Sequence, residues 1–296
     1  MNRPNLFLIG AMKSGTTTLH ELLAPHPQIS MSEPKEPCYF VEPNMLKAHW
    51  PEMWQRGIWK SEEAYLALFP EKSSARYFGE SSTDYSKAPQ LPGIAEKVAA
   101  YSPDARIVYI MRDPVERTIS HYWHMAEHRR ETRNPLEAIT QDPHYTDVSY
   151  YAFQLLPYID HFGLSRVYAL TFEALKADPR QTVQSLYAWL GLDPDFEPAQ
   201  LGGARNVTPE AVRQQRAGRG WLDRVRHSLL WEKVGGYCPA ALRKVGVAML
   251  EKPVQPKTAD LSEVRTYLRN LQVPQTAELT ALLGRNFVEW KTLYGE

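Results

Sequence analysis

The sequence has few cysteines, no net charge and no long apolar run. Only Cys38 and Cys238 occur among 296 residues. Two cysteines are too few for a disulfide framework, which favours a reducing compartment and predicts a cytoplasmic location. Lysine plus arginine and aspartate plus glutamate both number 34, so the formal charge is zero. This balance argues against charge-driven binding of nucleic acid, although it leaves room for a local basic cleft.

No run of about 18 apolar residues occurs, so no transmembrane segment is expected. The apolar residues 6–12 are too short to cross a bilayer, and they lack a basic leader and a cleavage site. No internal repeat, low-complexity tract or linker divides the chain. We therefore expect a single domain over residues 1–296, long enough to bury a substantial core.

The first twenty residues have the pattern of an anion-binding turn. Residues 6–9 form a short apolar run typical of a buried strand, Gly10 ends it, and apolar residues at helical spacing begin at Leu19. A helix that starts directly after such a turn points its free N–H groups and its positive dipole end at one place. The residues expected to hold an anion there are Lys13, Ser14, Gly15, Thr16, Thr17 and Thr18.

Strands and helices alternate along the chain. Further strands are expected at 28–31, 77–82, 106–111 and 166–172, with helices at 93–101, 114–128, 150–162 and 178–190. This alternation predicts an α/β fold, a three-layer sandwich with a mainly parallel central sheet and helices on both faces, similar to phosphate-loop proteins. Residues 41–72 are expected to be irregular with one short helix. Residues 200–258 are expected to form a basic, flexible segment, either a lid or simply a surface loop, and two helices, at 260–271 and 276–283, are expected to close the chain.

A second anion-binding turn follows the clearest strand, 106–111. Asp113 has the properties of an N-cap and Glu116 completes a capping box with it, so a helix begins at Pro114. Arg112, at the strand exit, offers a planar fork of donors that suits a phosphate. Ser120 lies about two helical turns further on, near one face of the same helix.

These two turns resemble the signatures of sulfotransferases that use 3′-phosphoadenosine 5′-phosphosulfate (PAPS). The order Gly-x-x-Lys-Ser-Gly-Thr-Thr at 10–17 resembles the family's 5′-phosphosulfate loop, with the lysine before the second glycine rather than after it. The string at 110–122 resembles the second signature, in which an arginine and a serine grip the 3′-phosphate; these would be Arg112 and Ser120. The resemblance implies PAPS as co-substrate and no metal.

A third match is Lys-Glu-Pro-Cys-Tyr-Phe at 35–40, which is similar to a string in bacterial sulfotransferases and in the heparan-sulfate branch. The resemblance implies that Glu36 is the catalytic base and that Lys13 stabilises the leaving phosphate. Cys38 replaces a frequent histidine, and Ser81 stands where the heparan-sulfate branch has a lysine, which weakens a glycosaminoglycan acceptor. The family closes the nucleotide site with a basic loop, and the candidates here are Arg205, Arg213 and Arg216.

The resulting hypothesis is transfer of a sulfonyl group from PAPS to a hydroxyl, with an amine as second choice, on a small molecule, lipid or carbohydrate. One alternative is a phosphate-loop kinase or nucleotide hydrolase, which would need a lysine after Gly15 and an acidic residue at a strand end to hold magnesium. The clearest strand ends in Arg112 instead. The other alternative is a non-catalytic nucleotide-binding protein. Neither the acceptor nor the oligomeric state is encoded in a recognisable pattern.

Two clusters of residues remain outside these signatures. His121, His124 and His128 follow Arg112 on one helix, and the last two have the spacing of a metal-ligand pair. No further ligand completes a metal site, so we expect a packed or solvated face, from which His121 or His124 could approach the acceptor. Trp50, Trp54 and Trp59 would either line an apolar acceptor pocket or fill the core.

Overall fold

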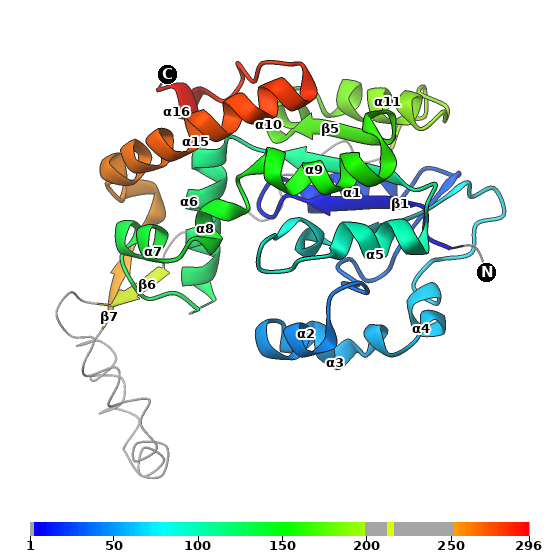
Figure 1. The fold of residues 1–296 in the computed structure, drawn as a ribbon, viewed down its shortest axis with the longest axis horizontal. Helices are drawn as coiled ribbons and strands as arrows, with labels where there is room; N and C mark the ends of the chain where they lie inside the picture. Colours follow the sequence, from blue (N-terminus) through cyan, green and yellow to red (C-terminus); the bar gives the residue numbers. More distant parts are fainter. Residues whose placement is uncertain (1–2, 129, 199–211, 216–250, 296) are drawn as a thin grey trace, which may run out of the picture.

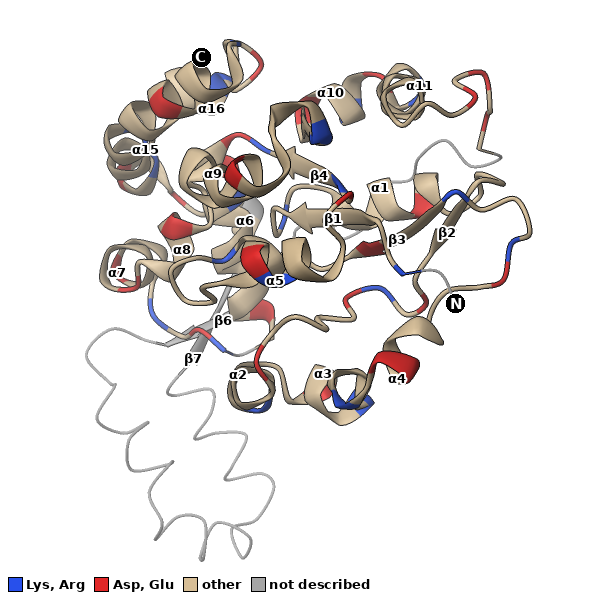
Figure 2. Ribbon diagram, turned by 45° about the vertical axis from the view of Figure 1, so that its right-hand side comes forward, with Lys and Arg blue, Asp and Glu red and all other residues tan. Residues whose placement is uncertain are grey.

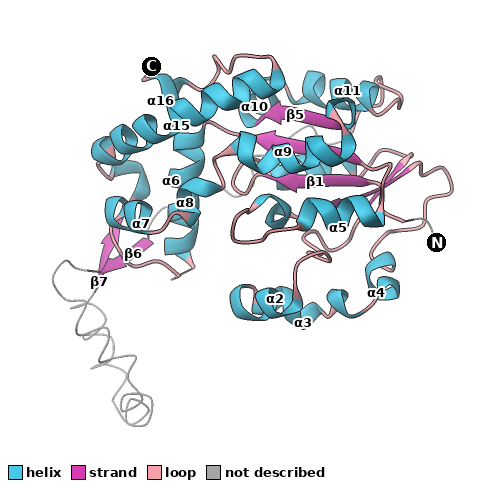
Figure 3. Cartoon of the chain, in the orientation of Figure 1, coloured by secondary structure: helices cyan, strands magenta, loops and turns pink. Residues whose placement is uncertain are grey.

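A central sheet of parallel strands organises the protein. The computed structural model describes residues 3–128, 130–198, 212–215 and 251–295. The sheet has five strands in the order β2-β3-β1-β4-β5, and all its pairings are parallel (Figure 3). The strands are β1 (Leu6–Gly10), β2 (Ile29–Met31), β3 (Tyr77–Ser81), β4 (Arg106–Met111) and β5 (Val167–Thr171). The expected α/β fold is therefore confirmed, and the central sheet is wholly parallel.

Helices cover both faces of the sheet, because successive residues of each strand point to opposite sides. Leu6 and Leu8 of β1 pack on the face covered by α1 (Thr16–Leu23) and α11 (Pro179–Trp189). Phe7 and Ile9 pack into a larger cluster on the other face. The helices that contribute to this cluster include α5 (Ile94–Tyr101), α6 (Pro114–Glu127), α9 (Tyr151–Phe162) and α15 (Ser262–Leu283) (Figure 1).

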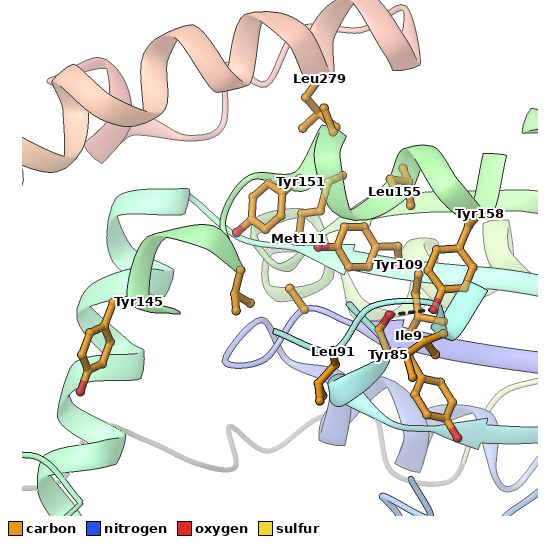
Figure 4. Packing of buried hydrophobic residues seen from close by; sticks show 14 of the residues in the cluster. Ile9, Tyr85, Leu91, Tyr109, Met111, Tyr145, Tyr151, Leu155, Tyr158 and Leu279 are labelled. Carbon is orange, nitrogen blue, oxygen red and sulfur yellow. Dashed lines mark hydrogen bonds between the residues drawn. The ribbon is translucent and has the colours of Figure 1, made fainter. Parts of the chain in front are cut away.

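Tyrosines are prominent in the larger cluster and they bring their own hydrogen bonds into it. Figure 4 shows Tyr109, Tyr151 and Tyr158 among the aliphatic side chains between β4 and α9. The Tyr158 hydroxyl donates a hydrogen bond of 2.7 Å to the backbone oxygen of Tyr85. A buried tyrosine needs such a partner, and this one fastens α9 to the segment that follows β3.

The segment between β2 and β3 contains more helix than expected. Instead of one short helix it has three, α2 (Pro43–His49), α3 (Pro51–Arg56) and α4 (Glu62–Leu66). A proline begins each of the first two, and Ser61 caps the third by accepting from the backbone of Ala64. These helices are too short to show clear periodicity, which is why the sequence pattern did not reveal them. They lie below β1 in Figure 1, and Tyr65 of α4 reaches the sheet, where its hydroxyl donates to the Glu80 carboxylate of β3.

The C-terminal part differs from the expectation in one respect. We predicted two helices at 260–271 and 276–283, but the chain forms one continuous helix, α15, with Pro274 inside it. A proline removes one backbone hydrogen bond, and here Val264, Leu268 and Leu279 hold the helix in place by packing on both sides of that point. The chain then ends with α16 (Lys291–Tyr294).

Three short helices complete the described main body: α7 (Pro135–Gln141), α8 (His144–Asp147) and α10 (Phe172–Ala177). A two-stranded antiparallel ribbon, β6 (Val212–Gln215) with β7 (Glu251–Val254), lies beside α6 and away from the main sheet (Figure 1). The rest of the lid-like segment predicted at 200–258, including Arg205 and Arg216, lies largely outside the described residues. Arg213 is in β6, where its backbone pairs opposite Pro253.

Charged residues of both signs are interspersed over the described elements (Figure 2). This matches the equal numbers of acidic and basic residues in the sequence. Among the described residues, no helix has the length and apolar character needed to cross a membrane.

Candidate functional site

The turn after β1 adopts a conformation that only a few residue types accept. Lys13 has φ 67° and Gly15 has φ 93°, both in the left-handed region. Gly15 is the N-cap of α1, and it supplies no side-chain hydrogen bond to the first turn of the helix. A Cβ at Gly15 would also lie 2.8 Å from Cδ2 of Phe172. Glycine is therefore required here both by the backbone angle and by the contact with Phe172.

Ser14 differs from its neighbours in the turn. Its backbone N–H donates to the oxygen of Ala11 at 3.1 Å. Its side chain is fully buried, and its hydroxyl oxygen has no hydrogen-bond partner among the described residues. Ser14 also does not line the cavity described below. The geometry thus gives Ser14 a place inside the turn rather than on the surface that would face a ligand.

The turn after β4 touches the first turn directly. Nη1 of Arg112 lies 3.4 Å from the backbone oxygen of Lys13, and its guanidinium carbon is 5.2 Å from the ring centroid of Phe172. The Tyr151 hydroxyl donates to the backbone oxygen of Arg112 at 2.6 Å. Because both the backbone and the side chain of Arg112 are held, its donors have a defined direction.

The helix that follows Arg112 has the predicted N-cap, Asp113, but does not form the predicted capping box with Glu116. Oδ1 of Asp113 accepts from the backbone N–H groups of Val115 and Glu116, at 3.0 and 3.2 Å. The capping box was wrong, because the backbone N–H of Asp113 donates to Oε1 of Glu173 at 3.0 Å. The Glu116 carboxylate instead faces Arg265, at 3.7 Å. A long-range partner has replaced the local one.

Glu36 is fixed by its surroundings on three sides. Its carboxylate forms an ion pair with Lys35 and accepts from the backbone N–H of Thr83 at 2.8 Å. Arg56, at the end of α3, donates to the backbone oxygens of Lys35 and Glu36 at 3.0 and 3.2 Å. The side chain is 19% exposed. The carboxylate is therefore oriented while it keeps a face open to solvent.

One cavity of about 1020 Å³ joins these features. It brings together Lys13, Glu36, Arg112 and Ser120, four residues that are far apart in the sequence. It is also lined by Gly15, Thr16, Thr17, Thr18, Lys35 and Phe172. Parallel strands place their carboxyl ends at one edge of the sheet, which is why the turns after β1 and β4 meet there.

Lys13 lies in a partly dehydrated environment at this edge. Burial lowers the pKa of Lys13, Glu127 raises it by its negative charge, and Arg112 lowers it further. The net direction is downward from the usual value for lysine. Two cations at one end of a cavity repel each other, and an anion between them would relieve that repulsion.

Sequence reasoning missed a buried ion pair in the wall of the cavity. Asp84 and Lys87 lie in the short 3₁₀ helix Thr83–Ser86 and the residue after it, and both side chains are only 3% exposed. The Lys87 ammonium lies 4.7 Å from the centroid of the Trp50 ring. Neither residue belongs to a motif, and their spacing of three is common on exposed helices. Only the burial of both side chains distinguishes this ion pair from an ordinary surface pair.

Phe172 is the other functional residue that was missed. Phe172 directly follows β5, just as Arg112 directly follows β4, and Gly10 is the last residue of β1. Because ligands bind at the carboxyl ends of parallel strands, the same argument from strand ends also identifies Phe172. It was instead taken as the last residue of a strand. In the structure it begins α10 and lines the cavity between Gly15 and Arg112.

Among the three histidines on α6, His121 and His124 line the cavity. Burial is the main cause that lowers the pKa of both, to about 4 for His124, so both are neutral at pH 7. Ligand atoms of His124, Glu127 and His128 lie within 4.8 Å of one another, and His128 Nδ1 is 2.8 Å from the His124 backbone oxygen. The absence of a metal stays a prediction.

The tryptophans divide between two places. Trp50 lines the cavity. Trp54 and Trp59 stack on each other with ring centroids 6.0 Å apart, and the Trp59 indole donates to the backbone oxygen of Trp54 at 2.9 Å. The expected apolar pocket wall therefore includes only the first of the three, and the other two pack between α3 and the turn that follows it.

Solved structures and curated proteins resemble this chain. A sulfotransferase from Alicyclobacillus acidocaldarius superposes with a TM-score of 0.71 at 26% identity, covering 98% of this chain and 100% of that one. Bifunctional heparan sulfate N-deacetylase/N-sulfotransferase 1 of Caenorhabditis elegans is 28% identical over 210 residues, 65% of this chain and 22% of that protein. Membrane-associated sulfotransferase kil1 of Dictyostelium discoideum is 33% identical over 132 residues, 45% and 25% of the two chains.

The chain spans about a quarter of the length of these curated relatives. A family model described as "Sulfotransferase family" matches residues 4–198. That range contains both turns, the Glu36 loop and every described residue that lines the cavity. With two thirds of its length matched, the chain belongs to the sulfotransferase family, whose members use PAPS as the sulfonyl donor.

Proposed function

We propose that this protein transfers a sulfonyl group from PAPS to a hydroxyl of a small-molecule, lipid or carbohydrate acceptor. The observation that carries the proposal is the meeting of Lys13, Glu36, Arg112 and Ser120 in one cavity. Two turns rich in hydrogen-bond donors and a carboxylate, all lining one cavity, fit a 3′,5′-bisphosphate donor and an acceptor that must lose a proton.

The nucleotide would be held at the two strand ends. The N–H groups at the start of α1 and the hydroxyls of Thr16, Thr17 and Thr18, which line the cavity, would bind the phosphosulfate. Arg112 and Ser120 would bind the 3′-phosphate, because both line the cavity, Arg112 just before α6 begins and Ser120 about two turns along that helix. Arg112 supplies charge and direction, and Ser120 supplies a neutral donor.

Glu36 would act as the general base. Its carboxylate takes the proton of the acceptor hydroxyl while the acceptor oxygen forms a bond to sulfur. The bond between sulfur and the bridging oxygen of the 5′-phosphate breaks, and that oxygen keeps the electron pair. Lys13, which lines the same cavity, would stabilise this negative charge. The Thr83 N–H, 2.8 Å from Glu36, holds the carboxylate in one orientation throughout.

The test compares Glu36→Gln with Glu33→Gln, an exposed carboxylate three residues earlier in the same loop that does not line the cavity. With labelled PAPS and a panel of hydroxyl and amine acceptors, Glu36→Gln should lose at least about a hundredfold in turnover. Calorimetry with 3′-phosphoadenosine 5′-phosphate (PAP) should give a dissociation constant close to that of the wild type. Failure of the wild type to bind PAP would refute the donor, and full turnover by Glu36→Gln would refute the base.

A further inference from the structure

Methionine side chains form much of the apolar wall of the cavity next to Glu36. Met45 of α2 and Met53 of α3 line it together with Trp50, which lies between these two helices. Met125 of α6 and Met12 of the first turn line the cavity as well. Methionine has a flexible, polarisable side chain that adapts to apolar ligands of different shapes. A polar, hydroxyl-rich ligand would gain little from such a wall.

The residues of this wall lie close to Glu36, the proposed base. Arg56, at the end of α3, holds the backbone oxygen of Glu36, and Sγ of Cys38 lies 3.8 Å from Sδ of Met53. Lys87 stands over Trp50 and pairs with Asp84, the residue after the Thr83 that bonds Glu36. The methionines and Trp50 therefore line the region where an acceptor would meet Glu36.

The charges in this region are already paired. Lys87 pairs with Asp84, Lys35 with Glu36, and Arg130 with Glu52 at 3.4 Å. Among the described residues that line the cavity, the other two cations are Lys13 and Arg112, which belong to the nucleotide turns. An anionic acceptor would have to compete with a carboxylate for one of these cations. At the buried pair of Lys87 and Asp84 it would leave a buried carboxylate without its partner, which is unfavourable.

Neutral histidines complete the polar part of the wall. His121 is fully buried, and burial lowers its pKa, with Arg117 and then His144 adding to the effect. Burial also lowers the pKa of His144, to about 3, with Lys87 as the next cause. Both side chains can exchange a hydrogen bond with a hydroxyl but bring no charge to bind an anion.

We infer that the acceptor is an uncharged, largely apolar alcohol or phenol, bound against Met45, Trp50 and Met53 with its hydroxyl at Glu36. The inference rests on the proposed function and names the substrate class of the same site. It differs from the acceptor named for the curated heparan sulfate relatives. The paired charges disfavour a polyanion at this wall, and the methionines favour an apolar body over a sugar ring.

The experiment uses the full chain with labelled PAPS and four acceptors of stated chemistry. These are 2-naphthol, 1-decanol, glucosamine and de-N-sulfated heparin. We expect kcat/KM for the first two to exceed that for glucosamine and for heparin by at least about tenfold. We also expect 2-naphthol to bind the complex with PAP in calorimetry. Preference for de-N-sulfated heparin, or no binding of 2-naphthol to that complex, would overturn the inference.

Variants of Met45 test whether the acceptor binds against this wall of the cavity. Met45→Gln keeps the length of the side chain and makes it polar, so KM for 2-naphthol should rise by about tenfold while the dissociation constant for PAP stays the same. Met45→Leu should lower KM again. Leu156→Gln introduces the same polar side chain at an exposed apolar residue of α9 outside the cavity, so it controls for any effect of glutamine that is unrelated to the wall. An unchanged KM in Met45→Gln would place the acceptor elsewhere.

The design separates this inference from the proposed function. If the wild type does not bind PAP, the proposed function fails. If it binds PAP and sulfonates only a sugar hydroxyl, the proposed function stands and the apolar acceptor is refuted. If it sulfonates only the amine, the PAPS donor stands, and both the hydroxyl and the apolar acceptor are refuted.

Discussion

The indole Nε1 of Trp290 donates a hydrogen bond of 3.2 Å to Oε2 of Glu173, across 117 residues of sequence. The other oxygen of Glu173 accepts from the backbone of Asp113, next to Arg112. The backbone N–H of Leu293 adds a bond of 2.9 Å to Oδ2 of Asp113. The C-terminal end of the chain is therefore hydrogen-bonded to the turn that we assign to the 3′-phosphate.

Replacing Trp290 by phenylalanine should loosen this turn. Trp290→Phe keeps an aromatic ring but removes a donor from an oxygen of the half-buried Glu173, which costs about 1 kcal/mol. We expect the free energy of unfolding in urea to fall by that amount, with weaker binding of PAP. The double variant with Glu173→Gln should lose less than the sum of the two single changes, because they remove the same bond. Additive losses would show that the two residues act independently.

Gly15 should tolerate no side chain. Gly15→Ala would combine an unfavourable φ of 93° with a Cβ only 2.8 Å from the Phe172 ring. We expect a loss of more than about 2 kcal/mol in unfolding free energy and at least a tenfold weaker binding of PAP. Calorimetry and urea unfolding would measure both.

Gly93→Ala is the matched control for Gly15→Ala. Gly93 is also an N-cap with positive φ, 73°, but a Cβ there meets no atom within 4 Å. It should lose only the backbone term, about 1 kcal/mol, with unchanged PAP binding. Equal losses in the two variants would mean that the contact with Phe172 has no energetic role.

The residues at the strand ends could be predicted from the sequence, but the side chains that pack around those residues could not. Gly10 and Arg112 could be placed because each follows an apolar strand directly, and the order of strands and helices then defines the edge of the sheet. Glu173 could not be placed, since a capping box with Glu116 was the simpler local solution. Only the packing of β5 beside β4 brings the Glu173 carboxylate to Asp113.

The acceptor side was hidden for a related reason. The pairing of Asp84 with Lys87 has meaning only because both side chains are buried, and burial depends on how α2 and α3 cover the turn after β3. Those helices are short and begin with Pro43 and Pro51, so no periodic pattern shows them. Tertiary packing, which local patterns do not encode, determines this wall of the cavity.

Lys13 should matter more for turnover than for binding. In the proposed mechanism its partly buried ammonium stabilises the charge that develops on the leaving phosphate, whereas the N–H groups at the start of α1 would also bind that phosphate in the ground state. We expect Lys13→Ala to lower turnover about a hundredfold or more while the dissociation constant for PAP rises less than tenfold. Single-turnover kinetics and calorimetry would measure the two effects.

The control for Lys13→Ala is Lys176→Ala, an exposed lysine of α10 outside the cavity, which should change neither quantity. Equal losses in turnover and in PAP affinity for Lys13→Ala would make Lys13 a binding residue only.

Glu80 should give the protein a pH-dependent stability. It is fully buried at the end of β3, where it accepts hydrogen bonds from Tyr65, Tyr85 and Ser82. Burial raises the pKa of Glu80 to about 7, against the lowering effect of these three bonds. Because the folded state binds this proton more tightly than the unfolded state, its contribution to stability is complete below about pH 4.5 and is lost as pH rises through about 7.

The wild type should therefore lose about 2–3 kcal/mol from Glu80 between pH 4.5 and pH 8. Other groups titrate over the same range, so the quantity to measure is the difference between the wild type and Glu80→Gln. Glutamine keeps a carbonyl oxygen for the tyrosines and has no proton to lose. Urea unfolding at pH 5 and at pH 8 should show Glu80→Gln less stable than the wild type at pH 5, with the gap closing or reversing at pH 8. A constant gap would show that Glu80 does not titrate between these two pH values.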